Sequence, residues 1–151
     1  MKWNLVSGCL TALMIAGLTG CSSTSSVSSA ASLYSKLGGS SSVSSLASSF
    51  VGSSLKDPRL AGLTAGKSTD TTAATSKVSD QLCSMLGGGC KAPLTDSQVN
   101  SAASKVSPAQ ASAISDNFAS SLSKVVSDPS VRQLVTSSVG SKLPGVLGAV
   151  L

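Results

Sequence analysis

Residues 42–51 read SVSSLASSFV, and every apolar residue in this stretch falls on one side of a helix. The apolar positions follow the spacing i, i+3, i+4, i+7 and i+8, which is typical of the buried stripe of an amphipathic helix. They are Val43, Leu46, Ala47, Phe50 and Val51. We expect this helix to end before Asp57-Pro58, because the residue before a proline avoids the helical region.

The segments on both sides of this helix are also helical in pattern. Residues 32–37 predict a brief helical turn that ends at Gly38-Gly39. Residues 60–67 predict a connection, and a longer helix is expected from Asp70 to the three glycines at 87–89. The apolar stripe of that longer helix consists of Ala74, Val78, Leu82 and Met85.

Three more helix starts follow in the second half of the chain. Thr95 or Asp96 can cap a short helix that runs through Ser104. Ser107-Pro108 and Asp128-Pro129 each place a capping side chain before a proline, which the first turn of a helix accepts. The stripes of the last two helices are Ala111, Ile114, Phe118, Leu122, Val125, and then Val131, Leu134, Val135, Val139.

The chain end and the overall class complete the prediction of the fold. Gly140 or Pro144 is expected to end or kink the last helix. No alternating apolar run bounded by hairpin turns occurs anywhere in the sequence. The sequence therefore predicts an all-α fold.

The N-terminal segment looks like the leader of a bacterial lipoprotein. An apolar run from Leu5 to Leu18 follows Lys2 and is shorter than a membrane span. Residues 17–21, GLTGC, resemble a lipobox, which implies cleavage before Cys21 and lipidation of that cysteine. Ser22 favours sorting to the outer membrane, again by resemblance. An ordinary secretory signal and a retained membrane helix are the two alternatives.

The chain thus divides into three expected parts: a signal peptide at 1–20, a lipidated Ser-rich linker at 21–31, and a helical domain at 32–151. The linker is too polar to pack, so we expect it to connect the lipid to the helical domain. Partners are expected to be the membrane, through the lipid, and an unknown protein or apolar ligand.

Composition argues against several classes of function. The formal charge of +5 falls to +4 when Lys2 is removed, since 5 − 1 = 4, and the basic residues occur singly without interleaved aromatic residues. That pattern argues against nucleic-acid binding. The chain contains no histidine, which removes the usual base for a serine or cysteine nucleophile, and it has no phosphate-binding glycine motif. We therefore expect no enzymatic activity and no catalytic residues.

Two cysteines remain in the expected helical domain, Cys83 and Cys90. An even pair in an oxidising compartment predicts a disulfide, and the glycines between the two residues make such a short loop feasible. A metal site is the alternative, but two thiolates without histidine or a nearby carboxylate do not complete a usual zinc shell. No metal is expected.

Three ordered motifs resemble the group 1 truncated haemoglobins. They are residues 33–39, LYSKLGG; Phe50 followed by residues 55–61, LKDPRLA; and residues 82–90, LCSMLGGGC. The resemblance implies a two-over-two globin-like helical domain and, in a typical member, haem that binds oxygen or nitric oxide.

The positions that such a protein uses to hold haem and its ligand have changed here. The resemblance places Phe50-Val51 where a Phe-Tyr pair is usual, and Ala74 and Val78 where polar distal side chains are usual. The segment 96–106, which should hold the proximal histidine, has none. We therefore expect conventional haem ligation to be lost, and a structural, interaction or apolar-ligand-binding module to remain.

The alternative is a haem protein with an axial ligand other than histidine, because haem iron needs a strong axial donor. The candidate donors are Tyr34, Met85, Cys83 and Lys77. Each also has a structural interpretation as a packed, disulfide-bonded or solvated side chain. We expect no cofactor, and haem is the cofactor whose binding should be tested.

Overall fold

The computed structural model describes residues 33–66 and 68–151. The regular structure in these ranges is helical, which confirms the all-α prediction. The signal peptide, Cys21 and the Ser-rich linker lie outside the described residues. Within the described ranges, no helix has both the length and the apolar character needed to span a bilayer. The two-over-two globin arrangement stays a prediction.

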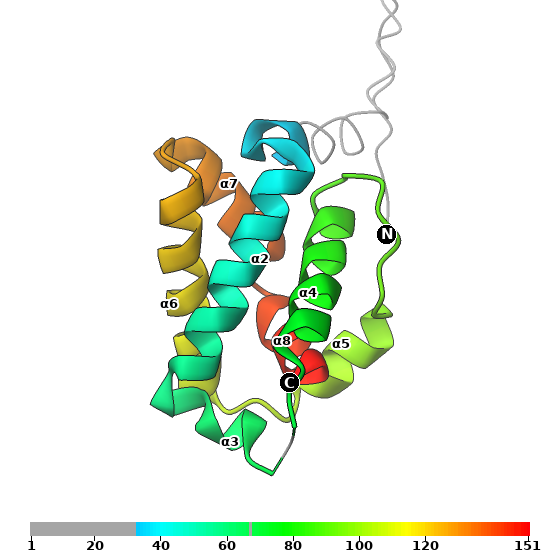
Figure 1. The fold of residues 1–151 in the computed structure, drawn as a ribbon, viewed down its shortest axis with the longest axis vertical. Coiled ribbons are helices and arrows are strands. Elements are labelled where there is room, and N and C mark those ends of the chain that lie inside the picture. Colours follow the sequence, from blue (N-terminus) through cyan, green and yellow to red (C-terminus); the bar gives the residue numbers. More distant parts are fainter. Residues whose placement is uncertain (1–32, 67) are drawn as a thin grey trace, which may run out of the picture.

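The helices follow one another with short connections (Figure 1). A helical turn at 33–37 comes first. The elements after it are α2 (Gly39–Lys56), η1 (Pro58–Leu60), α3 (Ala61–Thr64), α4 (Thr71–Met85), α5 (Asp96–Ala103), α6 (Pro108–Val125), α7 (Pro129–Val139) and α8 (Leu143–Val150).

The predicted helix starts are confirmed, because each has the expected cap. The Asp70 carboxylate accepts hydrogen bonds from the first amides of α4, and the Asp128 carboxylate does the same for α7. Thr95 and Ser107 form capping boxes at the starts of α5 and α6. In both boxes the glutamine three residues later accepts a hydrogen bond from the backbone amide of the capping residue.

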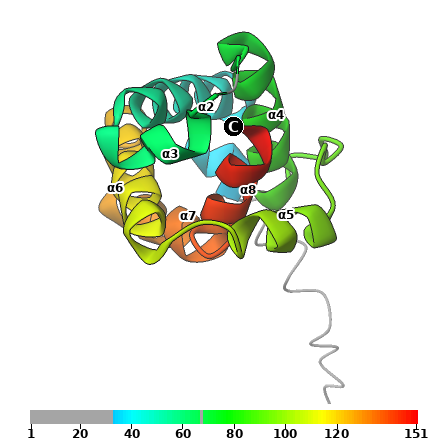
Figure 2. The ribbon, with the colours of Figure 1, turned by 90° about the horizontal axis from the view of Figure 1, so that it is seen from below.

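The core lies where α2, α4, α6 and α8 meet. Helix α2 packs against α4 on one side and α6 on the other, and α8 packs against α4, α5 and α6. Seen along the bundle in Figure 2, the other helices surround α8. The short C-terminal helix is therefore the central element of the fold.

The chain end confirms the predicted stop and adds one helix. Helix α7 ends at Val139 with Gly140 as its C-cap, and Pro144 belongs to the first turn of a further helix, α8, which the sequence did not predict. A proline is tolerated there because the first helical amides have no intrahelical acceptor. The residues of α8 are apolar almost all round, which is typical of a helix surrounded by other helices.

The local predictions on either side of α2 had different outcomes. The connection at 60–67 contains the end of η1 and the short helix α3, which the sequence did not predict. The first helical turn does end at Gly38, as predicted, and α2 begins at once at Gly39. Both glycines adopt positive φ, 100° and 72°, so the chain changes direction there without an extended linker.

Candidate functional site

The four side chains that the globin resemblance would place in a haem pocket belong to the hydrophobic core. Phe50 and Val51 on α2 and Val78 on α4 have no exposed surface, and Ala74 on α4 is only 3% exposed. The ring of Phe50 packs edge to face against Phe118 on α6, with centroids 5.4 Å apart and planes at 88°. All of these side chains belong to one buried cluster. The structure therefore brings these positions together as packing residues.

The alternative haem donors do not form one converging set. Cys83 is bonded to Cys90, and the Tyr34 ring lies over Gly88. Met85 is half-buried against the core, which corrects its assignment to the buried stripe. Lys77 is exposed beside a hollow that Ala74 also lines.

Cys83 and Cys90 form a disulfide with their Cα atoms 5.7 Å apart. It ties the last turn of α4 to the loop that follows. A Cβ atom on Gly88 would lie 2.5 Å from the Tyr34 ring and 2.6 Å from the Cys83 Sγ atom, closer than side chains approach. The glycine thus allows the helical turn at 33–37 to pack directly on the disulfide loop.

A polar cluster that the sequence did not predict joins the end of α2 to α6. The Arg59 guanidinium donates to Asp57 at 2.9 Å and to Asp116 at 3.0 Å, and Asn117 donates to Asp57 at 2.9 Å. The hydrogen bonds from Arg59 are the main reason that the pKa of Asp57 falls to about 2. The same contacts raise the pKa of Arg59 above its usual value. The cluster therefore connects the segment after α2 to α6.

The described residues contain no gathering of three or more histidine, cysteine or acidic side chains that could hold a metal ion. Cys83 and Cys90 are bonded to each other, and Arg59 forms an ion pair with each of the two acidic residues of the cluster. These groups therefore stabilise the helices.

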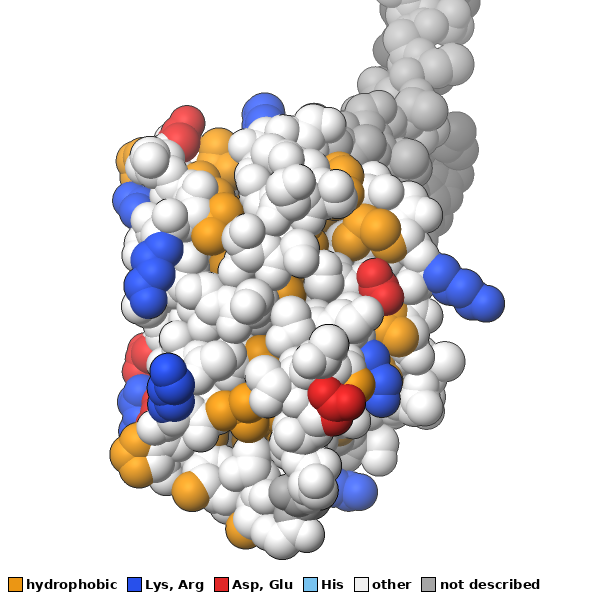
Figure 3. Space-filling model, viewed as in Figure 1, with side chains coloured by type: hydrophobic (Ala, Val, Ile, Leu, Met, Phe, Trp, Pro, Cys, Tyr) orange, Lys and Arg blue, Asp and Glu red, His pale blue; other side chains and the backbone are white. Residues whose placement is uncertain are grey.

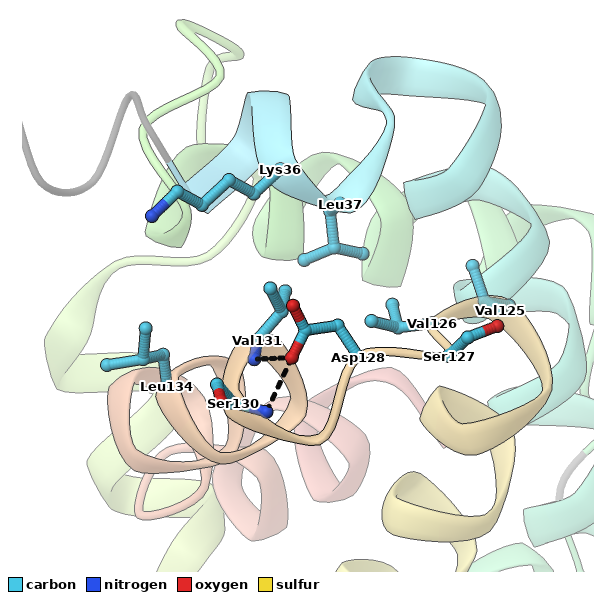
Figure 4. A pocket seen from close by; sticks show the side chains of 9 residues that line it. All are labelled: Lys36, Leu37, Val125, Val126, Ser127, Asp128, Ser130, Val131 and Leu134. Atoms are coloured by element: carbon cyan, nitrogen blue, oxygen red, sulfur yellow. Dashed lines mark hydrogen bonds between the residues drawn. The ribbon is translucent and has the colours of Figure 1, made fainter.

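A hollow of about 460 Å³ lies where α6 ends, α7 begins and the 33–37 turn passes over both (Figure 4). The Asp128 carboxylate in it accepts hydrogen bonds from the amides of Ser130, at 2.8 Å, and Val131, at 3.4 Å. Leu134, 48% exposed, is the large hydrophobic side chain most open to solvent among the described residues. The lining residues are Lys36, Leu37, Val125, Val126, Ser127, Asp128, Ser130, Val131 and Leu134.

Leu134 and Val125 correct the predicted stripes. Helix α7 buries only Val135 and Val139, so Leu134 turns away from the core, and Val125 is half-buried at the rim of the hollow. The sequence signal was available in part: Leu134 and Val135 are adjacent, and neighbouring residues on a helix point about 100° apart.

A second hollow, of about 450 Å³, runs between α2 and α4. Its lining is almost entirely hydroxyl-bearing: Ser44, Ser48, Thr71, Thr72, Thr75, Ser76, Ser79 and Asp80. Figure 3 shows that the face carrying α2 and α4 has only small, separate hydrophobic areas and scattered charges. This face is mostly polar.

No known protein family, curated protein sequence or solved structure matches this chain. The proposals below therefore rest on the residues and their geometry.

Proposed function

We propose that this chain is a lipid-anchored protein of the bacterial outer membrane, facing the periplasm or the surface, whose helical domain serves as a structural or interaction module. The anchor is Cys21, supported by the lipobox-like sequence at 17–21 and the short apolar run before it. A linker of polar residues then separates the lipid from the first helical turn.

The packing of Phe50, Val51, Ala74 and Val78 is the observation that carries the second half of this proposal. If the domain descends from a haem-binding globin, these are the side chains that would face iron-bound ligand. Here they fill the space between α2 and α4 and offer no donor atom. A chain without histidine also lacks the usual proximal ligand. We infer a domain that keeps its helices for packing and has lost conventional haem ligation.

The alternative, haem held by an unusual ligand, has less support. Of the four candidate donors, Cys83 is engaged in a disulfide and Lys77 lies on the surface. Tyr34 and Met85 are half-buried side chains packed against the core.

Metabolic labelling with a fatty acid in a Gram-negative host tests the anchor. We expect label on the wild-type chain and none on Cys21→Ala, because that cysteine is the proposed acylation site. Several acyl chains, each contributing ~0.8 kcal/mol per buried CH₂, would hold the protein stably in a bilayer. The matched control is Cys9→Ala, which changes a cysteine of the proposed leader and should keep full labelling. Equal label on Cys21→Ala would refute the anchor.

A further inference from the structure

We infer that the end of the helical domain that carries Leu134 docks on the surface of the bilayer that holds the lipid anchor, through contacts with anionic lipid headgroups. This inference rests on the proposed anchor at Cys21. The docking face is defined here as Lys36, Lys124, Val125, Val131 and Leu134.

The first argument is the position of the face relative to the anchor. The helical domain begins at Leu33, and Lys36 in the first helical turn lines the same hollow as Leu134 (Figure 4). Only the residues 22–32 separate Leu33 from Cys21, a span of at most about 40 Å when fully extended. The proposed anchor is thus attached through a short linker to the end of the domain that carries this face. In Figure 1 this end is at the top, where α2 and α7 start and α6 finishes.

The second argument is the apolar content of the face. Leu134 is exposed, and Val125 and Val131 beside it are half-buried at the rim of the hollow. The opposite end of the domain instead carries the Asp57–Arg59–Asp116 cluster, in which the charges are already paired. A shallow apolar rim next to a lipid anchor suits the interface between headgroups and acyl chains.

The third argument is charge. Lys36 is exposed at the rim, and Lys124 is exposed in the last turn of α6. Neither forms an ion pair with a residue in the described part of the chain. The one acidic group of the hollow, the Asp128 carboxylate, caps the first amides of α7. Two ammonium groups against this one carboxylate leave an excess of positive charge beside the apolar rim, which complements an anionic lipid surface.

The affinity of such a small face for free vesicles would be weak. The tether makes docking intramolecular, so the lipid surface has a high effective concentration and a weak contact suffices. The face therefore needs the anchor to reach a useful occupancy, and its apolar and basic side chains determine which end of the domain meets the membrane.

Tryptophan fluorescence of the full lipidated chain in vesicles tests this inference. The only tryptophan, Trp3, precedes Cys21, so the processed protein has none, and Leu134→Trp supplies a single reporter. Ser130→Trp, also on the exposed lining of the hollow, is a second reporter. Ser112→Trp, exposed in the first half of α6 toward the other end, is the control. The vesicles are phosphatidylethanolamine with or without phosphatidylglycerol, and contain a lipid with a nitroxide-labelled headgroup.

We expect the emission of both hollow reporters to shift to shorter wavelength and to be quenched when phosphatidylglycerol is present, while the Ser112→Trp control stays unquenched. Adding Lys36→Gln with Lys124→Gln to Leu134→Trp should reduce that quenching to the control level. Lys56→Gln with Lys105→Gln, which removes the same charge elsewhere, should leave it unchanged.

Flotation of the vesicles distinguishes failure of the docking face from failure of the lipid anchor. Protein that floats with the vesicles but shows equal quenching of all three reporters, or none, overturns the docking face and leaves the anchor standing. Protein that does not float overturns the anchor and the docking face with it.

Discussion

Gly145 lies where α8 closely approaches α5, and its replacement by alanine probes the central position of α8. A Cβ atom at this position would overlap the carbonyl oxygen of Val99 on α5 and lie 2.7 Å from the Val99 Cγ1 atom. The carbonyl is part of the α5 backbone and cannot rotate away. The overlap can be relieved only if α8 moves from α5.

The expected magnitude follows from two opposing contributions. Alanine in place of glycine inside a helix normally stabilises by about 1 kcal/mol. Forcing extra volume into a packed contact costs about 1–3 kcal/mol, and a backbone atom places this case at the upper end. We therefore expect Gly145→Ala to lower the free energy of unfolding by about 2 kcal/mol, the difference between these two contributions.

Gly52→Ala is the matched control, since Gly52 also lies inside a helix but has no neighbouring atom within 4 Å of a Cβ. It should raise the free energy of unfolding by up to about 1 kcal/mol. Gly148→Ala, with its Cβ 3.1 Å from the movable Cγ2 atom of Val106, should fall between the two. Urea unfolding of the soluble chain from Ser22, followed by circular dichroism, measures all three. If Gly145→Ala is as stable as Gly52→Ala, the close contact of α8 with α5 does not exist.

Two further predictions concern the cysteine pair and the polar cluster. Alkylation without reductant should leave Cys83 and Cys90 unmodified in protein isolated from the periplasm, and two reactive thiols would contradict the disulfide. Replacing both cysteines by serine should lower the free energy of unfolding by less than the ~3 kcal/mol expected of a disulfide that closes a 15-residue loop. The lowered pKa of Asp57 means that its carboxylate stabilises the fold fully above the unfolded value of 3.8, and that this stabilisation is lost as pH falls toward about 2. Wild type and Asp57→Asn should therefore differ in urea midpoint at neutral pH and converge over that acidic range, and a constant difference would refute the role of the cluster.

Most helix boundaries could be predicted from residues close together in the sequence. The caps at Asp70, Thr95, Ser107 and Asp128 involve residues at most three positions away, so the sequence alone contains the relevant partners. The same holds for the end of α2 at Lys56, which the following Asp57-Pro58 imposes.

Contacts between residues that lie far apart in the sequence could not be predicted. Asp57 meets Asn117, 60 residues later, and nothing near either residue indicates the other. Ser54 and Ser121 are fully buried in α2 and α6 with their hydroxyls unpartnered, although serine is usually a surface residue. They lie on the buried faces because small side chains fit there, a reason that only the packed helices reveal.

Among the candidate site residues, those on a periodic apolar face were also predictable, and those that depend on neighbouring helices were not. The apolar stripe predicted Phe50, Val51, Ala74 and Val78 as buried, because periodicity identifies the face of a helix that packs. It misassigned Leu134, because α7 lies at the edge of the bundle and only one side of it is covered. Which side stays open depends on neighbouring helices, and the hollow beside it was therefore not foreseen.

Titration of the purified soluble chain with haem tests the central proposal, that this helical domain does not ligate haem as a globin does. We expect no sharp Soret band at stoichiometric haem and no haem retained through gel filtration, because the chain has no histidine and the positions that the globin resemblance would place beside an iron-bound ligand are packed. A faint, broad shift from weak apolar association fits this account. A sharp five- or six-coordinate spectrum that survives gel filtration would contradict it. Variants of Tyr34, Met85 and Lys77 would then identify the axial ligand.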